Sequence, residues 1–399
     1  MGIRIGVLTG GGDCPGLNSV LYGVLLKASE KKEIEEIIGI EKGWNGFLTN
    51  KTRKLDITSL DDLHTIGGTL LYTSRTNPFK DVMKEKDLEE REKKVKEIAE
   101  EMTSQFDTLG IDVLIVIGGD DTLGVADAMH KYADAKVIGV PKTVDNDLAS
   151  TDYTFGFWSA VQLASNSMDN ITTTARSHQR IFVIQIMGRD AGWLTLVSGI
   201  STGADIILIP ERPFDFEKEI ISVLKERVRV GRKYHIIACS EGAVPTLESL
   251  KKDFKTLTQD AIDKLPKDDF GNPLLSKLNM SQIIVEELNL RKDLKEYFNL
   301  NDAEYDVRDV VLGHTMRAGT PNSFDRILGL RLGIHAIKLV IEGKFGLMTC
   351  LHGDKIEAVP LSEGAQKKLV PKDSDLIELG DLITRVKYHK NHRLQGEKE

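Results

Sequence analysis

The stretch IRIGVLTGGGDCPGLN, residues 3–18, gives the strongest indication of the fold. It is a short apolar run that ends in three glycines and leads into an amphipathic segment at 17–30. Similar apolar runs recur along the chain and alternate with amphipathic stretches, as buried parallel strands and their connecting helices do. The sequence therefore predicts an α/β fold of right-handed strand–helix–strand units, with helices on both faces of each sheet.

The expected strands are rich in Ile and Val and cover residues 3–9, 34–40, 112–117, 135–140, 180–187, 205–209, 233–239 and 307–312. The expected helices cover residues 17–30, 83–107, 122–132, 157–175, 190–200, 215–230, 276–289 and 323–342. Residues 245–304 interrupt this alternation, because they are polar and rich in Lys and Asp, and they predict a surface excursion with some helix. Ligands of such folds bind beyond the carboxyl ends of the strands, so we expect the ligand-binding residues in the loops that follow strands.

The composition excludes several classes of partner. The formal net charge is −8, and this acidic balance argues against a nucleic-acid or anionic-membrane partner, which requires a basic face. The three cysteines are far apart and have neither disulfide-framework nor metal-ligand spacing, which favours a reducing compartment. The chain shows no secretory signal and no apolar run of the ~20 residues that a membrane span needs, so we expect a cytoplasmic protein.

The glycine-rich loop GGGDCPGLN, residues 10–18, is the first candidate for phosphate binding. Glycines bring backbone N–H groups close to an anion, and the helix that follows adds its partial positive charge. The loop has no G-x-G-x-x-G register, and Leu17-Asn18 stands where a Walker A motif has Lys-Ser, so a tight turn without ligand is the alternative. Cys14, ahead of the helix N-terminus, is expected to have a lowered thiol pKa, with a buried inert thiol as the alternative.

Two further loops after strands are rich in carboxylates. IGGDDT, residues 117–122, has two adjacent acids that suit a hydrated divalent cation. Alternatively, Asp121 or Thr122 caps the next helix, and both interpretations can hold together. PKTVDND, residues 141–147, places Lys142 and Thr143 beside an acidic pair. Phosphoryl transfer uses such groups, a carboxylate as base and an ammonium to neutralise phosphate charge, although a plain turn is the alternative.

A set of basic residues lies at predicted strand ends and in Gly/Pro loops. Arginine's planar fork suits phosphate recognition, and this placement favours a shared phosphate over scattered surface positions. The set consists of Arg180, Arg189, Arg308, His314 and Arg317.

Taken together, these segments resemble the phosphofructokinase family. The resemblance runs from residue 5 to about residue 335, in family order, through GGGDCPGLN, GGTLLYTSR, IGGDDT, PKTVDND, SHQR, MGRDAGWL, CSEG and LGHTMRAGTPNSFDR. It implies two doubly wound Rossmann-like domains with the active site in the cleft between them. The implied donor domain covers residues 1–156 with 316–365, and the implied sugar-phosphate domain covers 157–315 with 366–399.

The resemblance also implies a role for each matching residue. Asp145 stands at the position of the family's base, which takes the proton of the sugar C1 hydroxyl. The resemblance implies that Lys142 and Arg189 are further catalytic groups. The implied magnesium (Mg²⁺) ligands are Asp120 and Asp147. The implied donor-binding residues are Gly11, Gly12, Arg75, Asp121 and Thr122. The implied sugar contacts are Thr143, Asp145, Met187, Gly188, Arg189 and Glu241. The implied clamp on the 6-phosphate is Arg180, Arg308, His314 and Arg317.

Asp121 and Lys142 predict the phosphoryl donor. In the family, Gly at these two positions is usual for enzymes that use ATP, whereas Asp and Lys are characteristic of enzymes that use pyrophosphate. Asp121 adds volume and negative charge where a nucleotide's α-phosphate would lie, and two like charges 4 Å apart cost about 4 kcal/mol at an effective dielectric of 20. Lys142 can instead hold the departing phosphate.

The implied reaction is reversible phosphoryl transfer from pyrophosphate to fructose 6-phosphate. Because Arg180 and Arg308 of this family reach into a neighbouring subunit, a homo-oligomer, dimer or tetramer, with shared active sites is also implied. Three alternatives stay open: ATP as donor, sedoheptulose 7-phosphate as acceptor, and a non-catalytic regulatory subunit. The presence of Asp120, Asp145 and Asp147 disfavours the last one.

Overall fold

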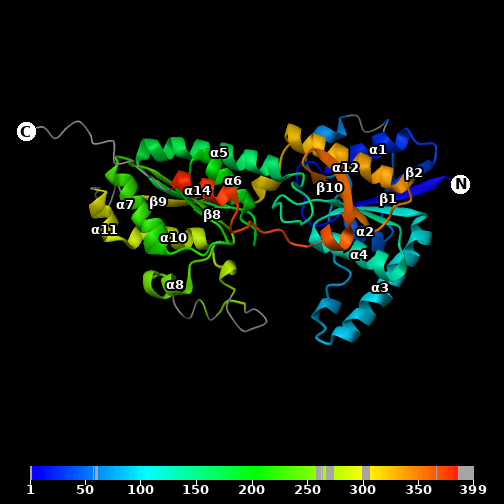
Figure 1. Ribbon diagram of the computed structural model, residues 1–399, viewed down its shortest axis with the longest axis horizontal. Helices are drawn as coiled ribbons and strands as arrows, with labels where there is room; N and C mark the ends of the chain where they lie inside the picture. The colour runs from blue at the N-terminus through cyan, green and yellow to red at the C-terminus, as the bar shows by residue number, and fades with distance from the viewer. Residues whose placement is uncertain are drawn as a thin grey trace, which may run out of the picture. The chain divides into compact units, whose positions relative to one another are not determined.

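The computed structural model describes residues 2–56, 58, 62–257, 262, 264–266, 274–298, 306–364 and 366–384. The chain divides into two compact units, one made of residues 1–160 and 314–368 and the other of 161–313 and 369–399. Figure 1 shows the elements of both units. Among the described residues, no helix is long and apolar enough to cross a membrane.

The first unit is built on a mixed sheet, and its strands are β1 (Ile3–Thr9), β2 (Ile34–Ile40), β3 (Thr52–Leu55), β4 (Val113–Gly118), β5 (Val137–Pro141), β10 (Leu347–His352) and β11 (Lys355–Pro360). The strand order is β11-β10-β5-β4-β1-β2-β3. The inner strands run parallel, whereas β3 and β11 are antiparallel to their neighbours. All six residues of β4 are buried, because helices cover both faces of the sheet.

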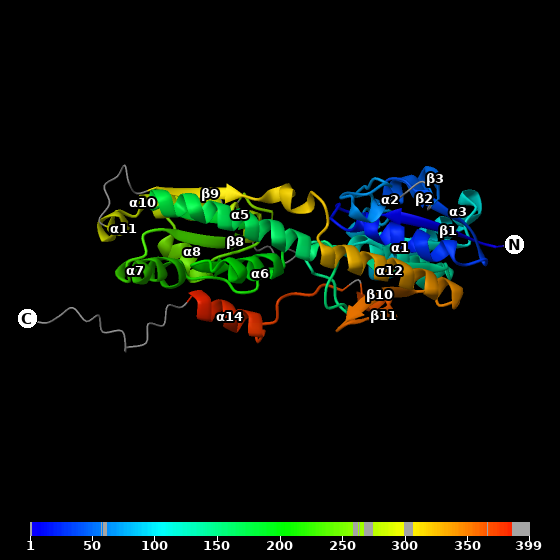
Figure 2. The ribbon, with the colours of Figure 1, turned by 90° about the horizontal axis from the view of Figure 1, so that it is seen from above.

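One face of this sheet carries α1 (Leu17–Ser29) and α12 (Ser323–Ile341), which pack side by side (Figure 2). Their close approach depends on Gly23, Gly329 and Gly333, where an added Cβ would overlap or crowd the other helix. The opposite face is covered by α2 (Gly43–Leu48), α3 (Leu88–Leu109), α4 (Asp120–Ala133) and α13 (Leu361–Gly364). Single-turn 3₁₀ segments are η2 (Leu63–Thr65), η3 (Val82–Lys84) and η6 (Gly313–Arg317).

The second unit has a parallel sheet, and its strands are β6 (Ile181–Ile186), β7 (Ile206–Leu208), β8 (His235–Ser240) and β9 (Val307–Val311). The order is β7-β8-β6-β9. Its helical segments are α5 (Phe157–His178), of which residues 157–160 belong to the first unit, α6 (Trp193–Thr202), the π-helix η4 (Phe216–Ile221), α7 (Ser222–Arg229), α8 (Leu247–Asp253), the 3₁₀ turn η5 (Leu275–Lys277), α10 (Met280–Leu290), α11 (Lys292–Tyr297) and α14 (Asp375–Thr384). Thus both units have the expected α/β class.

Residues 245–304 contribute more to the core of the second unit than their polar composition indicates. Met280, Ile284 and Leu288 of α10 are almost fully buried, as is Leu294 of α11. Residues 258–261, 263, 267–273 and 299–305 lie outside the described residues. The excursion therefore includes a packed helical part.

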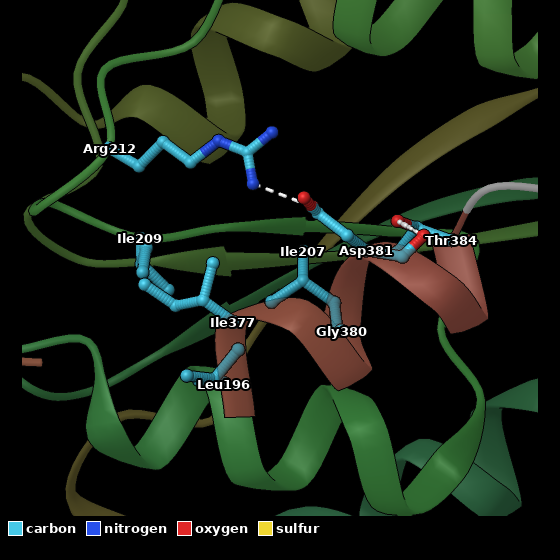
Figure 3. A pocket seen from close by; sticks show the side chains of 8 residues that line it. All are labelled: Leu196, Ile207, Ile209, Arg212, Ile377, Gly380, Asp381 and Thr384. Atoms are coloured by element: carbon cyan, nitrogen blue, oxygen red, sulfur yellow. Dashed lines mark hydrogen bonds and ion pairs between the residues drawn. The ribbon is translucent and has the colours of Figure 1, made fainter. Parts of the chain in front are cut away.

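Helix α14 packs against α6 and β7 over a small cavity of about 30 Å³ (Figure 3). Leu196, Ile207 and Ile209 form its apolar wall, and the ion pair of Arg212 with Asp381, 2.6 Å long, lies at its edge. A space of this size holds about one water molecule. The apolar contacts around the cavity and the ion pair anchor α14 to the second unit, and the cavity itself is too small for a substrate.

Candidate active site

The first unit has its topological switch point at β1, which pairs with β2 on one side and β4 on the other. Ligands of open α/β sheets bind in the crevice outside the strand ends at this point. Gly10 follows β1, and Gly119 and Asp120 follow β4. The glycine loop and the IGGDDT loop are therefore neighbours at the edge where a ligand is expected.

The glycine loop is held by residues of the GGTLLYTSR segment. The Gly11 N–H donates to the Ser74 carbonyl at 2.9 Å, and the Thr73 hydroxyl donates to the Gly11 carbonyl at 2.6 Å. Gly11 has φ +82°, which a side chain would disfavour. Arg75 is exposed and directly follows Ser74, so these contacts place it beside the loop. The predicted donor residues Gly11, Gly12 and Arg75 thus belong to one local structure.

Two cationic side chains converge on Gly12. The buried Lys142 ammonium donates to the Gly12 carbonyl at 2.6 Å, and a Cβ added at Gly12 would overlap the Arg317 guanidinium. Burial lowers the pKa of Lys142; Arg317 acts in the same direction, whereas Asp145 and Asp147 raise it. This part of the loop can therefore receive a multiply charged anion. Arg317, predicted for the 6-phosphate clamp, lies on the glycine-loop side of the first unit.

Helix α4 begins where the IGGDDT loop ends. Thr122 is buried, and its side chain fills the space beside Gly10 and Gly118, where an added Cβ would overlap it. Asp120 is half-buried and Asp121 exposed, both in the first turn, where the helix dipole favours carboxylates. Thr122 thus has a packing role, while the two acids remain accessible to a ligand.

The VDND loop lies beside this helix start. The Lys142 N–H donates to the Gly118 carbonyl at 2.9 Å, and the Asp145 N–H donates to the Thr143 hydroxyl at 3.0 Å. Asp145 is buried and Asp147 half-buried. Between them, Asn146 is buried and adopts the left-handed conformation with φ +53°. This turn lets the two acids of one short segment occupy different surroundings.

The carboxylates suit a magnesium ion that also binds phosphate. Among the described residues, no group of three or more His, Cys, Asp or Glu side chains could hold a metal alone. Mg²⁺ is usually held by one or two carboxylates plus substrate oxygens, so Asp120 and Asp147 fit this chemistry. They follow β4 and β5, which are neighbouring parallel strands, and Asp147 is close enough to Lys142 to raise the pKa of its ammonium.

Cys14 is a correction to the sequence analysis. The thiol is fully buried, and burial raises its pKa to about 12 instead of lowering it. The helix N-terminus was expected to favour the thiolate, but loss of solvation outweighs it. Cys14 is therefore the buried, inert thiol that was the alternative, and the expectation of a reactive cysteine was wrong.

In the second unit, the loops after β6 and β8 bring four of the six predicted sugar contacts together, whereas Thr143 and Asp145 belong to the first unit. The Glu241 N–H donates to the Ile186 carbonyl at 2.8 Å, and a Cβ at Gly242 would overlap the Arg189 carbonyl. Arg189 has φ +47°, an uncommon conformation for a residue other than Gly or Asn. Met187 and Gly188 lie in the same turn, so these four predicted residues form one cluster.

Arg180 and Arg308 lie elsewhere in this unit. Both pair with Asp306, through N–O distances of 2.6 and 2.9 Å, where β6 and β9 begin. Met187 to Arg189 follow the other end of β6, which spans about 20 Å over its six residues. Within one chain, therefore, these two arginines and the Met187–Arg189 turn lie at opposite ends of a strand.

Two residues that hold the candidate loops were not predicted from the sequence. Lys368 binds the VDND loop, and Glu211 accepts the N–H groups of Gly192 and Val370 at 2.9 Å each. Both stand in polar segments without a motif, so no sequence pattern distinguishes them from solvated charges. Only the folded chain identifies their partners.

Known proteins resemble this chain over most of its length. Residues 4–340 match the phosphofructokinase family, so the chain belongs to this family of phosphotransferases. Its particular relatives differ in donor. The chain is 42% identical over 373 residues to the pyrophosphate–fructose 6-phosphate 1-phosphotransferase of Amycolatopsis methanolica, with 93% and 97% of the two chains covered.

It is also 40% identical over 372 residues to the ATP-dependent 6-phosphofructokinase 2 of Streptomyces coelicolor, with 93% and 97% of the chains covered. Among solved structures, the pyrophosphate-dependent phosphofructokinase of Marinobacter aquaeolei superposes with a TM-score of 0.69 at 22% identity, covering 96% and 91% of the chains. That likeness concerns the fold. Relatives of similar identity are therefore named for either pyrophosphate or ATP as donor, and similarity alone does not identify the donor of this chain.

Proposed function

We propose that the chain transfers a phosphoryl group reversibly from inorganic pyrophosphate to the C1 hydroxyl of fructose 6-phosphate, giving fructose 1,6-bisphosphate and phosphate. The observation that carries the donor assignment is the buried Lys142 ammonium, bound to the Gly12 carbonyl within the glycine loop. A fixed cation there suits a compact, highly charged leaving group. The exposed Asp121 at the start of α4 adds negative charge that disfavours a nucleotide's α-phosphate.

The proposed chemistry needs one proton transfer and one displacement. Asp145 accepts the proton of the C1 hydroxyl, and the oxygen of this hydroxyl attacks the nearer phosphorus of pyrophosphate. The bond from that phosphorus to the bridging oxygen breaks, and phosphate leaves beside Lys142 and the glycine loop. Mg²⁺, held by Asp120 and Asp147, would neutralise charge on the phosphate oxygens.

We further propose that the second unit supplies the sugar-phosphate contacts. Met187, Gly188, Arg189 and Glu241 cluster after β6 and β8 and would bind the sugar, together with Thr143 of the first unit. Arg180 and Arg308 would bind the 6-phosphate of a neighbouring subunit's substrate, because they lie at the other end of β6. His314 and Arg317 would complete the phosphate clamp. Because Arg180 and Arg308 would act on a neighbour's substrate, the working enzyme would be a homo-oligomer.

The overall reaction can be followed directly. Purified protein, magnesium, pyrophosphate and fructose 6-phosphate should yield fructose 1,6-bisphosphate and phosphate in equal amounts by phosphorus NMR, and the products should react back. Sedoheptulose 7-phosphate offered in competition tests the acceptor, since the same arginines could hold its phosphate. Preferential use of the seven-carbon sugar would contradict the acceptor assignment while leaving the donor assignment intact.

A further inference from the structure

Lys368 lies in the last segment of the first unit and binds the loop that carries Asp145 and Asp147. Its ammonium donates to the carbonyls of Thr151 and Asp152 at 2.8 and 3.1 Å and to the Asn146 side-chain oxygen at 3.2 Å. All three acceptors belong to residues 146–152, so one cation holds both ends of this loop.

The backbone around Lys368 reinforces the attachment. The Lys368 N–H donates to the Asp147 carbonyl at 2.7 Å, and the Ala149 N–H donates to the Gln366 carbonyl at 2.8 Å. Leu148 and Lys367 form an antiparallel bridge between these two bonds. Residues 366–368 thus run along residues 147–149 as a short added strand.

The Asn146 side chain connects this attachment to the acids on either side. Asn146 is 2% exposed and has φ +53°, a backbone conformation that costs free energy in a residue other than Gly. Its side-chain oxygen also accepts the Thr154 N–H at 3.1 Å, and the Thr154 hydroxyl donates to the Thr143 carbonyl at 2.7 Å. The unfavourable turn between Asp145 and Asp147 is therefore held by a network that ends on Lys368.

We propose that Lys368 is a positioning residue that fixes the turn at Asn146 and so sets the directions of the Asp145 and Asp147 carboxylates. It does not touch the reacting atoms. Its part in catalysis rests on the proposed function, whereas its part in ordering the loop does not. Misplacement of a reacting group by about 1 Å can cost on the order of a hundredfold in rate, so loss of this anchor should appear in turnover.

The test compares Lys368→Met with Lys368→Arg and with the matched control Lys367→Met, whose side chain is exposed. In K368M we expect kcat to fall by about ten- to a hundredfold, with KM for fructose 6-phosphate within about threefold. K368R should recover part of the loss, because its guanidinium can reach some of the same oxygens, and K367M should behave as the parent. A K368M kcat equal to that of the parent would overturn the proposal, as would equal losses in K368M and K367M.

A second readout does not depend on activity. Amide hydrogen exchange over residues 143–154 should be faster in K368M than in the parent and K367M, with the rest of the first unit unchanged. This result would support the anchor even if the parent proved inactive with pyrophosphate, which would refute the proposed function alone. Unchanged exchange would refute the anchor. If K368M does not fold, Asn146→Gly removes the bonded oxygen while relieving the backbone, and it should show the same faster exchange; parent-like exchange there would also refute the anchor.

Discussion

Lys142 and Asp121, the two residues on which the proposed donor site depends, differ in how far solvent reaches them. Lys142 is 5% exposed and bonded to the glycine loop, so its ammonium is held in place and poorly screened by solvent. Asp121 is exposed in the first turn of α4, and salt and water weaken its effect. The cation is therefore expected to contribute more to the transition state, and the acid more to the exclusion of other donors.

Substitution at these two positions should separate the two effects. Asp121→Gly should allow ATP to bind without giving full ATP turnover, because Lys142 remains. Adding Lys142→Gly should lower turnover with pyrophosphate about a hundredfold, because loss of a preorganised charge costs ~3 kcal/mol of transition-state stabilisation. Titration calorimetry with a non-hydrolysable ATP analogue measures binding apart from chemistry. Unchanged ATP binding in Asp121→Gly would refute the role of this acid in excluding ATP. The effects of the two substitutions need not add, because both side chains would face the same phosphate.

Asp145, the proposed general base, gives a second prediction at the scale of single residues. Asp145→Asn keeps the size of the side chain but cannot accept the hydroxyl proton, so kcat should fall by at least ~10²-fold. Fructose 6-phosphate binding, measured by calorimetry, and the melting temperature should stay close to the parent values. A variant with turnover within a few-fold of the parent would remove Asp145 from the mechanism.

At the level of elements, a buried carboxylate joins two helices next to the site. Asp325, in the first turn of α12, accepts the N–H and hydroxyl of Ser159, in the first turn of α5, at 2.7 and 2.6 Å. The Ser159 hydroxyl in turn accepts the Asn322 N–H at 2.9 Å. Burial raises the pKa of Asp325 from 3.8 to about 6, although the Ser159 bonds oppose this.

This raised pKa gives a pH prediction of definite sign. Because the folded state holds the Asp325 proton more tightly than the unfolded state does, this group stabilises folding progressively as the pH falls from about 6 to 4. Asp325→Asn lacks this effect. The free energy of unfolding of the parent relative to the variant should therefore rise by about 2 kcal/mol between pH 7 and pH 4. Denaturant titrations at both pH values measure it, and a constant difference would contradict the assignment.

Periodicity predicted the inner strands well because they are continuous apolar runs buried on both faces. The bounds of β1 and β2 agree with the expected 3–9 and 34–40, and β9 differs by one residue at its end. The strands β3, β10 and β11 were not predicted. In β3 the sequence TRKL has one buried residue, and β11 is an edge strand without a fully buried side chain, so neither has an apolar run. The run in β10 is interrupted by the buried Thr349.

At the level of the whole molecule, the motifs predicted which loops lie together in the candidate site but not every partner within them. Gly11, Gly12 and Lys142 come together because their loops follow β1 and β5, parallel strands of one sheet whose carboxyl ends meet at the same edge, which topology alone predicts. Arg75 lies beside them because the Gly11 N–H donates to the carbonyl of Ser74. The contact of Arg317 with Gly12 and the anchor at Lys368 depend on residues distant in sequence, which have no local pattern. Similarly, the separation of Arg180 from Met187 along β6 could be inferred only once the strand bounds were known.

That separation supports an active site shared between subunits. Asp145→Asn and Arg308→Ala chains should each be inactive alone, because one lacks the base and the other lacks a clamp on the neighbour's substrate. Mixed under conditions that allow subunit exchange, they should regain part of the parent activity, since some sites would be intact. No recovery, with exchange shown by native mass spectrometry, would argue that each chain works alone.

The identity of the phosphoryl donor is the central claim, and steady-state kinetics with both donors on one preparation tests it most directly. With saturating fructose 6-phosphate and magnesium, kcat/KM for pyrophosphate should exceed that for ATP by at least tenfold and by up to about a thousandfold; the upper figure corresponds to 4 kcal/mol of repulsion at Asp121, which solvent screening reduces because this side chain is exposed. Removing contaminating pyrophosphate from the ATP stock with pyrophosphatase is the necessary control. An enzyme that turns over ATP as efficiently as pyrophosphate would contradict the account and make the chain an ATP-dependent phosphofructokinase.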